Sequence, residues 1–174
     1  MNTAERFHYT MNCIYRAIET ICKVIDVINE LSSTAEARQI SVRHDVDDNL
    51  SPMFLNWDNI HSMLTNLVEN AVNYTPPDGQ IFIQTRLSES TITLKVQDTG
   101  FGISEEDLPC IFERFYRVDK ARSTHTGGTG LGLAIVKRTV EMYEGQIAVE
   151  SVVNQGTTFT ITLPLGQNLD ATTR

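Results

Sequence analysis

Two glycine clusters constrain this chain more than any other feature of its sequence. The first, Asp98-Thr99-Gly100-Phe101-Gly102, ends an apolar strand pattern, and the second, Gly128-Thr129-Gly130-Leu131-Gly132, precedes a helix pattern. Glycine lets a backbone turn sharply and approach a ligand closely, and backbone N–H groups at the start of a helix bind phosphate. The second cluster lacks the Gly-Lys-Ser/Thr ending of a P-loop, which excludes that fold. Together the clusters predict a nucleotide site.

Asp98, at the end of its apolar strand, is the candidate residue for recognising a base. An ionised carboxylate can only accept hydrogen bonds. Adenine presents an exocyclic amine as a donor, whereas guanine carries a carbonyl at the equivalent place. An aspartate at the bottom of an apolar pocket would therefore favour adenine over guanine. Taken alone, the motif is also compatible with an ordinary aspartate–glycine turn.

Three asparagines mark one edge of the helix predicted for Asn59–Tyr74. Asn66, Asn70 and Asn73 fall within an arc of roughly 60° on that helix, beside its apolar face. Asparagine has modest helix propensity, so three on one edge need an explanation. Their carboxamide oxygens could hold Mg²⁺, which shares its coordination between few protein oxygens, phosphates and water. A solvated helix edge is the alternative interpretation.

The segment between the glycine clusters is predicted to be a lid over the site. Ser104–Asp107 has the form of a capping box at a helix start, and Pro109 suits the first turn of a second short helix. The polar, glycine-rich stretch from Asp119 to Gly130 is expected to be mobile. An apolar stripe in this segment either packs on the domain or closes the site and docks a partner: Leu108, Ile111, Phe112 and Phe115.

Hydrophobic periodicity and turn residues predict three long helices and several strands, most of them joined as hairpins. Arg6–Met11 alternates weakly like a strand, Asn12 suits an N-cap, and a helix stripe runs from Ile14 to Leu31 and ends near Ser32–Thr34. The other predicted elements are strands Ile40–Val46 and Met53–Leu55, a helix Asn59–Tyr74 capped by Asp58, a hairpin of Gln80–Leu87 with Thr91–Gln97, a helix Leu131–Glu144 with Gly145 at its C-cap, and a hairpin of Gln146–Val152 with Thr157–Leu163. Helices on one face of a mixed sheet make an α+β two-layer sandwich.

Charge and cysteine content narrow the class of protein. The 174 residues suit one domain, and the net charge of −8 argues against nucleic acid or an anionic membrane as the main partner. The three cysteines show no metal-binding spacing and are expected to be free thiols in a reducing compartment. With no signal peptide and no apolar run of ~18 residues, a cytoplasmic location is expected, although a longer parent could be membrane-anchored. An anionic ligand would use a local basic patch near the glycine clusters: Arg114, Arg117, Lys120, Arg122, Lys137 and Arg138.

Four segments, in this order, closely resemble the ATP-binding catalytic domain of sensor histidine kinases, a branch of the GHKL ATPase superfamily. Asn66–Pro76 resembles the N box, Asp98–Ile103 the G1 box, Ile111–Arg117 the F box and Gly128–Leu133 the G2 box. The likeness is strong from about Asp58 to Pro164 and only general before that. The resemblance implies a mixed, mostly antiparallel five-stranded sheet under three long helices, with a mobile ATP lid.

The resemblance also implies ATP and Mg²⁺ as ligands, and roles for residues at matching positions. Asn70 would coordinate the Mg²⁺ that bridges the phosphates, and Asn66 would assist. Asp98 would receive the adenine amine, Tyr74 would flank the base or ribose, and Arg117 would reach the phosphates. Asn70 and Arg117 are thereby implied as catalytic. The implied nucleotide contacts are completed by Asn73, Gly100, Gly102, Ile103, Gly128, Thr129, Gly130, Leu131 and Gly132.

Two positions bear on affinity and on reaction type. The family usually has lysine where this chain has Asn73, so one phosphate-contacting charge is missing. Either Arg117, Lys120 or Arg122 substitutes for it, or the nucleotide affinity is weaker. Superfamily members that hydrolyse ATP carry a glutamate one turn before the metal-binding asparagine, where this chain has Asn66. An amide has no useful basicity, so the resemblance favours a site that holds ATP for a nucleophile brought from elsewhere.

That nucleophile is not evident in the sequence. The family's acceptor is a histidine followed by an acidic residue and a Leu-Arg-Thr-Pro-like run. Of the four histidines only His44 has an acidic follower, and it lies in a predicted strand. We therefore expect residues 1–165 to form the catalytic domain, with a lid at about 101–129, residues 166–174 to be a flexible tail, and the dimerisation and phosphoacceptor domain to be absent.

The leading interpretation is the catalytic part of a two-component sensor kinase. It would donate the γ-phosphate of Mg²⁺–ATP to a histidine on the dimerisation domain of the same parent, and act indirectly on a response regulator. Alone, the chain is expected to be monomeric and inactive in phosphotransfer. Two alternatives remain open: an anti-sigma-type serine kinase, against which the F box argues, and a non-catalytic module whose interactions are controlled by nucleotide.

Overall fold

The computed structural model describes residues 24–47, 56–88, 90–118 and 129–164. No helix among these residues is long and apolar enough to cross a membrane. Several predictions lie outside this part of the chain: the strand at Arg6–Met11, the cap at Asn12, the strand at Met53–Leu55, the tail at 166–174, and the lid or site residues Lys120, Arg122 and Gly128.

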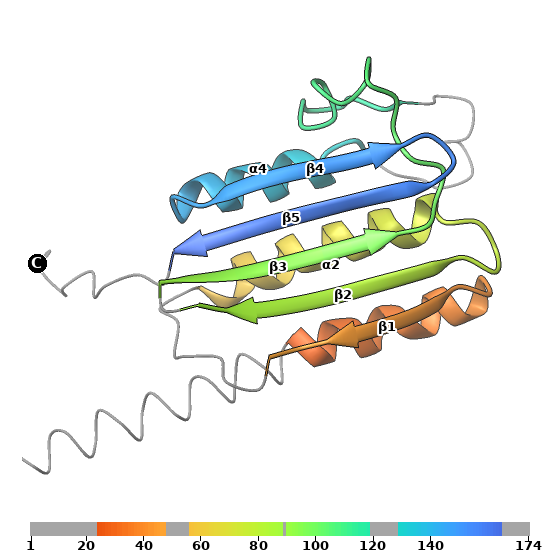
Figure 1. The fold of residues 1–174 in the computed structure, drawn as a ribbon. Coiled ribbons are helices and arrows are strands. Elements are labelled where there is room, and N and C mark those ends of the chain that lie inside the picture. The colour runs from red at the N-terminus through yellow and green to blue at the C-terminus, as the bar shows by residue number, and fades with distance from the viewer. Residues whose placement is uncertain (1–23, 48–55, 89, 119–128, 165–174) are drawn as a thin grey trace, which may run out of the picture.

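The strands form one five-stranded mixed sheet in the order β1-β2-β3-β5-β4 (Figure 1). β1 pairs with β2 in parallel, and the remaining pairs are antiparallel. Both predicted hairpins, β2 with β3 and β4 with β5, are confirmed. The strands are β1 (Ser41–Asp45), β2 (Gln80–Leu87), β3 (Thr91–Asp98), β4 (Gln146–Val152) and β5 (Gly156–Pro164).

The helices pack on one face of this sheet, which confirms the α+β two-layer class (Figure 1). They are a helix at 24–37, α2 (Trp57–Tyr74) and α4 (Gly132–Met142). Because strand side chains alternate between faces, every second residue of β3 is buried against the helices. The core between the layers includes Ile60, Met63, Leu64, Leu67, Val68, Ile81, Ile83, Val96, Val136, Val140 and Ile161. Removing this apolar surface from water is the main source of stability.

The start of α2 differs from the prediction that Asp58 caps a helix beginning at Asn59. The helix begins at Trp57, and the cap is Asn56, whose side chain accepts the backbone N–H of Asp58 at 2.9 Å. Asp58 instead lies in the first turn, where a negative charge interacts favourably with the helix dipole.

The helix at 24–37 continues past Ser32–Thr34, where the sequence predicts its end. Ser32 Oγ donates to the carbonyl oxygen of Ile28 at 2.6 Å, and Ser33 Oγ donates to that of Glu30 at 2.9 Å. Serine hydroxyls that bond back to the preceding turn do not compete with the helix for backbone groups, so the helix continues.

The C-terminal end of α4 also differs from the prediction. The helix ends at Met142, with Tyr143 rather than Gly145 as the C-cap. Glu144 adopts the left-handed conformation, with φ of 53°, that glycine usually supplies after a helix. The backbone N–H of Gly145 then donates to the carbonyl oxygen of Val140 at 2.9 Å, which closes the end of the helix.

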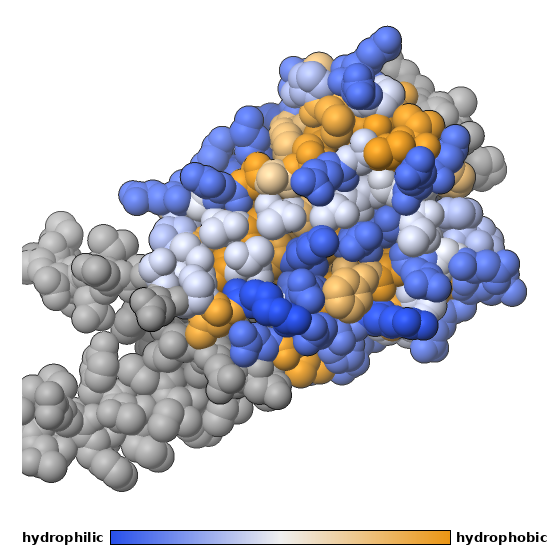
Figure 2. Space-filling view, in the orientation of Figure 1, coloured by the Kyte–Doolittle hydropathy of each residue, from blue (hydrophilic) through white to orange (hydrophobic). Residues whose placement is uncertain are grey.

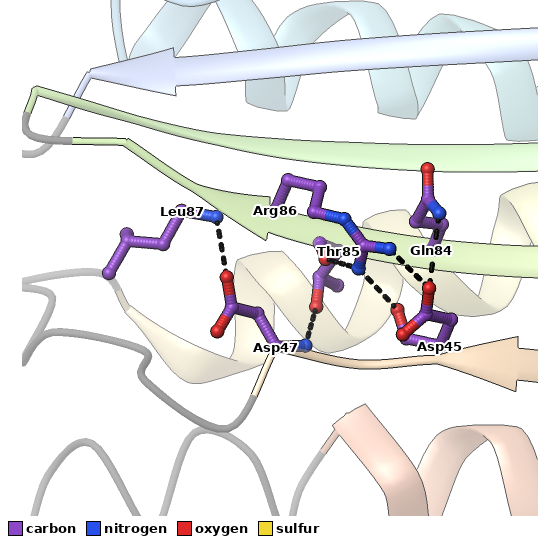
Figure 3. Close-up of polar contacts among 6 residues, drawn as sticks. All are labelled: Asp45, Asp47, Gln84, Thr85, Arg86 and Leu87. Atoms are coloured by element: carbon purple, nitrogen blue, oxygen red, sulfur yellow. Dashed lines mark hydrogen bonds and ion pairs between the residues drawn. The ribbon is translucent and has the colours of Figure 1, made fainter.

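Two aspartates tie the end of β1 to β2 (Figure 3). The backbone N–H of Asp47 donates to Thr85 Oγ1 at 3.0 Å, and Asp47 Oδ2 accepts the backbone N–H of Leu87 at 3.2 Å. Asp45 forms an exposed ion pair with Arg86, whose hydrogen bond lowers the pKa of Asp45. An exposed pair contributes little to stability. The Asp47 side chain instead extends the pairing with β2 beyond the last residue of β1.

The other face of the sheet is mostly polar (Figure 2). Threonines line its central strands and are half-buried: Thr91, Thr93, Thr158, Thr160 and Thr162. Apolar residues gather near the turn between β4 and β5, where Val152 and Val153 are exposed. The apolar core therefore lies on the helix side of the sheet, and the ends of the helices on that side define the region in which a buried ligand site can form.

Candidate nucleotide-binding site

Asp98, the last residue of β3, is a buried carboxylate on the helix side of the sheet, with 7% of its surface exposed. Its Oδ1 accepts the backbone N–H groups of Gly100 at 2.8 Å and of Thr157 at 3.3 Å. Burial raises the pKa of Asp98, against these two hydrogen bonds, which lower it. Both bonds from the described residues go to one carboxylate oxygen, so Oδ2 is the oxygen that could accept a ligand amine.

The C-terminal end of α2 lies against the loop that follows Asp98. The carbonyl oxygen of Tyr74 accepts the backbone N–H of Phe101 at 3.0 Å. A Cβ placed on Gly100 would lie 2.3 Å from that same oxygen, so the two backbones are in direct contact. The side chain of Tyr74 is 41% exposed at this end of the helix. The structure thus brings the end of the asparagine helix next to Asp98.

The turn between β4 and β5 holds the same loop from the other side, which sequence reasoning missed. Ser151 Oγ accepts the backbone N–H of Ile103 at 2.8 Å and lies 2.9 Å from Thr157 Oγ1. The backbone N–H of Asn154 donates to the carbonyl oxygen of Phe101 at 2.7 Å. The one sequence signal was a serine at a helix-facing position of β4, where isoleucine or valine otherwise stands.

Asn66 lies where α2 approaches the start of α4. Its Nδ2 donates to the carbonyl oxygen of Ser62 at 2.7 Å, and a Cβ placed on Gly132 would lie 2.7 Å from its Oδ1. Leu131 is the N-cap of α4, and its side chain makes no capping hydrogen bond. The first N–H groups of a helix need partners from outside the helix. The carboxamide oxygen of Asn66 and these N–H groups therefore border the same place.

Gly132→Ala is expected to weaken Mg²⁺–ATP binding by roughly 5- to 10-fold without loss of the fold. The new methyl group would displace the Asn66 carboxamide, a side-chain group that can move. Alanine is about 1 kcal/mol better than glycine only in a helix interior, and Gly132 is the first residue of α4. Urea unfolding should therefore show a stability within about 1 kcal/mol of the unsubstituted chain. Calorimetric titration measures the affinity, and exposed Glu141→Ala on the same helix is the control. An unchanged affinity would mean that Asn66 and the start of α4 do not contact the nucleotide.

Asn70 and Asn73 continue the asparagine edge toward the end of α2, and both are half-buried. Asn73 Oδ1 accepts a hydrogen bond from Nη1 of Arg38 at 3.0 Å, a contact between residues 35 positions apart that sequence reasoning also missed. The described residues contain no group of three or more His, Cys, Asp or Glu that could hold a metal. A carboxamide edge suits Mg²⁺ only where phosphate and water complete the coordination.

The first part of the predicted lid is not helical. Residues 105–112 form consecutive turns in place of the two short helices predicted there. Ser104 Oγ accepts the backbone N–H of Asp107 at 3.2 Å, as in a capping box, but also donates to Asp107 Oδ2 at 2.6 Å. Tyr116 Oη donates to Asp107 Oδ1 at 2.6 Å, which raises the pKa of Tyr116 to about 12. Asp107 therefore holds both ends of this segment in a compact turn.

The apolar stripe of the lid divides between two roles. Ile111 is buried, and the ring of Phe112 packs edge-on against Phe159 with centroids 6.4 Å apart. Phe115 points outward, with 72% of its surface exposed and a φ of 66°. Its backbone N–H donates to the carbonyl oxygen of Gly130 at 2.8 Å. Packing on the domain thus accounts for Ile111 and Phe112, whereas Phe115 is exposed.

The remaining candidate residues flank residues 119–128. Arg117 precedes them and is half-buried, whereas Thr129 follows them and is exposed. Gly102 and Gly130 adopt left-handed backbone conformations, with φ of 66° and 69°. The hydrogen bond between Phe115 and Gly130 brings the two flanks of this segment together directly before the start of α4.

The described parts of the site are connected through α2. α2 contacts the loop after Asp98 at its C-terminal end and approaches the start of α4 at Asn66. A mixed sheet with helices on one face, with polar groups at the C-terminal end of α2 and at Asn66, matches the ATP-binding domain that the sequence resembles.

Comparison with known proteins identifies the family. A family model described as histidine kinase-, DNA gyrase B- and HSP90-like ATPase matches residues 56–167, well over half of the chain. The chain belongs to this family.

Curated relatives carry the names of sensor kinases. The phosphate regulon sensor protein PhoR of Pseudomonas aeruginosa is 48% identical over 101 residues, which cover 58% of this chain and 23% of that protein. The sensor histidine kinase RppB of Synechocystis is 37% identical over 149 residues, covering 83% of this chain and 33% of that protein. The matched part of the chain therefore spans 23% to 33% of the length of these relatives.

Solved structures agree with the family assignment. The nucleotide-free catalytic domain of the histidine kinase ThkA is 26% identical with a TM-score of 0.71, covering 82% of this chain and 92% of that one. Full-length ShkA in complex with AMPPNP is 26% identical with a TM-score of 0.73, covering 86% of this chain and 30% of that one. The fold is that of the histidine-kinase catalytic domain.

Proposed function

We propose that this chain binds Mg²⁺–ATP and donates the γ-phosphate to a histidine on a separate dimerisation domain, as the catalytic part of a two-component sensor kinase. The observation that carries the proposal is Asn66 beside the start of α4. Its carboxamide faces the proposed phosphate cradle, and its Nδ2 donates to the carbonyl oxygen of Ser62. Because a carboxamide has no useful basicity, Asn66 cannot act as a general base for water. A site that positions ATP without activating water suits transfer to an external nucleophile.

The proposed roles are given in order from the base pocket to the phosphates. Asp98 accepts the adenine amine, Tyr74 flanks the base or ribose, and the loop from Gly100 to Ile103 forms the floor of the base pocket. Asn70 coordinates Mg²⁺ with help from Asn66. The phosphates are contacted by Asn73, Arg117 and the backbone from Gly128 to Gly132. We extend the catalytic domain over residues 1–165, with a lid at about 101–129.

The proposed reaction is an in-line displacement. A nitrogen of the acceptor imidazole attacks the γ-phosphorus, and the bond from that phosphorus to the β,γ-bridging oxygen breaks. ADP leaves with the electron pair, and the imidazole loses its proton to solvent. Mg²⁺ supplies neutralisation of phosphate charge when bound. The residues of this chain orient the phosphates and exclude water, and the resulting phosphohistidine would then supply a response regulator.

The acceptor is tested with the two-helix dimerisation domain of the PhoR relative, incubated with this chain and γ-labelled Mg²⁺–ATP. We expect an acid-labile, base-stable phosphoryl group on that domain and negligible ATP hydrolysis by the chain alone. A dimerisation domain whose acceptor histidine is replaced by glutamine is the control. An acid-stable product would favour a serine kinase. Nucleotide binding with no transfer to any acceptor domain would favour a non-catalytic module.

Asn70→Ala is expected to remove most of the dependence of ATP affinity on Mg²⁺. The carboxamide oxygen is the proposed protein ligand of the ion. Loss of a mere outer-shell partner of a metal ligand costs roughly 10- to 100-fold in metal affinity, so loss of the ligand itself should cost at least that much. Calorimetric titration with ATP in excess Mg²⁺ and in EDTA gives the two affinities. Glu69→Ala, at the exposed neighbouring position, is the control. A variant that responds to Mg²⁺ as the unsubstituted chain does would contradict the metal assignment.

A further inference from the structure

Arg38 contacts the last of the three asparagines on α2. Its Nη1 donates to Asn73 Oδ1 at 3.0 Å, and its Nη2 lies 3.5 Å from the backbone carbonyl oxygen of Asn73. Both side chains are half-buried. One guanidinium therefore touches both the side chain at the end of the asparagine edge and a carbonyl group in the last turn of the helix.

The backbone around Arg38 is fixed by a compact turn. The N–H groups of Arg38 and Ile40 both donate to the carbonyl oxygen of Ala35, at 3.0 and 2.9 Å, and Ala35 is fully buried. The next residue, Ser41, donates to the carbonyl oxygen of Gly79 at 3.0 Å. A side chain that leaves such a turn is largely positioned before any ligand arrives, which lowers the entropic cost of binding.

The electrostatics of α2 favour a cation at its C-terminal end. The C-terminal end of a helix carries partial negative charge. None of the residues in the last turn of α2 is basic, and Asn73 is neutral. A polyphosphate lying along the asparagine edge would be repelled by this end of the helix. Arg38 offsets that charge from outside the helix, and its bond to Asn73 Oδ1 leaves Asn73 Nδ2 to donate to a phosphate oxygen.

We propose that Arg38 is a nucleotide-positioning residue whose guanidinium supplies, from the turn after the helix at 24–37, the positive charge missing at Asn73. The inference rests on the proposed function, because it assumes that the phosphates of Mg²⁺–ATP lie along the asparagine edge. Arg38 lies outside the four sequence boxes and would be an additional residue of the site. It also replaces the lid residues Arg117, Lys120 and Arg122 as the source of the compensating charge.

The test compares a ligand with phosphates and one without. Mg²⁺–AMPPNP and adenosine are each titrated calorimetrically into the full 174-residue chain. Arg38→Gln should weaken AMPPNP binding by about 10-fold and leave adenosine binding within about twofold. Adding Asn73→Lys to that variant should restore most of the AMPPNP affinity. Arg43→Gln, an equal change of charge at an exposed position of β1, should alter neither affinity.

Each outcome separates this inference from the proposed function. If Arg38→Gln leaves AMPPNP binding unchanged, or weakens both ligands equally with a lower unfolding temperature, Arg38 has no charge role and the inference is overturned. A double variant as weak as Arg38→Gln also overturns it, because the restored charge then has no effect. If the unsubstituted chain binds neither ligand, the proposed nucleotide site itself is wrong. Arg38→Lys, which keeps the charge, should retain most of the affinity if the inference holds.

Discussion

Asp98→Asn is expected to weaken Mg²⁺–ATP binding by roughly 10- to 100-fold, the range of one hydrogen bond to a charged group, while the fold persists. An asparagine can keep its Oδ1 as acceptor for the N–H groups of Gly100 and Thr157. Its amide nitrogen then takes the place of Oδ2 and presents a donor to the adenine amine, which is also a donor. The preference for ATP over GTP should fall with the affinity.

The ATP affinity and the stability of the protein are expected to depend on pH in opposite directions. Burial raises the pKa of Asp98, and the ionised form is the one that is proposed to accept from the adenine amine. ATP affinity should therefore fall as the pH falls through that raised pKa, above the usual range for aspartate. For stability the sign is opposite: the contribution of Asp98 is fully present below its ordinary pKa and is lost as the pH rises through the raised one. At neutral pH, Asp98→Asn should hence raise the unfolding temperature.

Calorimetric titration of ATP and GTP, combined with thermal unfolding at several pH values, checks both expectations. Asp78→Asn makes the same chemical change at an exposed turn and serves as the control. Loss of ATP affinity together with a lower unfolding temperature at neutral pH would indicate a structural role for the carboxylate. An ATP affinity that stays within about twofold would remove Asp98 from the base pocket.

Gly156→Ala is expected to destabilise the protein by about 3 kcal/mol or more. Gly156 has a φ of 108°, which side chains rarely adopt, and a Cβ there would lie 1.9 Å from the carbonyl oxygen of Asp98. That neighbour is backbone at the end of β3 and cannot swing aside. Relief requires β5 to separate from the loop after Asp98, which would also break the hydrogen bond from Thr157.

Urea unfolding measures this loss, and ATP titration of the folded fraction should show weakened binding as well. Gln155→Ala changes the adjacent exposed residue of the same turn and should cost less than about 0.5 kcal/mol. If the free energy of unfolding of Gly156→Ala lies within about 1 kcal/mol of that of the unsubstituted protein, the contact between the hairpin and Asp98 is looser than the structure shows.

The sheet and the helix layer could be predicted because their signals are local. Alternating apolar residues and short polar connections mark β2–β3 and β4–β5, and a 3.6-residue period marks α2. Errors arose where two local signals competed. Asn56 and Asp58 are both good caps, two residues apart, and the sequence does not say which one begins the helix. The serines at 32 and 33 suggest a helix end but bond back into the helix.

The site was predictable in proportion to how closely its residues cluster in the sequence. Asp98 and the asparagines lie in recognisable motifs. Ser151 and Arg38 do not, because their contacts with Ile103 and Asn73 span 48 and 35 residues and exist only once β4 and the helix at 24–37 have packed. The turns of the lid escaped prediction for a different reason. Tyr116, nine residues further along the chain, donates to the carboxylate of Asp107, which the sequence assigns to a helix start.

The hydrogen bond from Thr157 to Asp98 joins residues 59 positions apart, and it has a consequence for biosynthesis. During translation Asp98 and its loop leave the ribosome long before β5 does. Domains generally fold as units, and contacts of long sequence separation form late. A nascent chain that has exposed β1 to β3 and α2 would therefore hold an incomplete pocket. Nucleotide should begin to stabilise the emerging protein only after the β4–β5 hairpin has docked, which makes ATP a ligand of the finished domain rather than an aid to its folding.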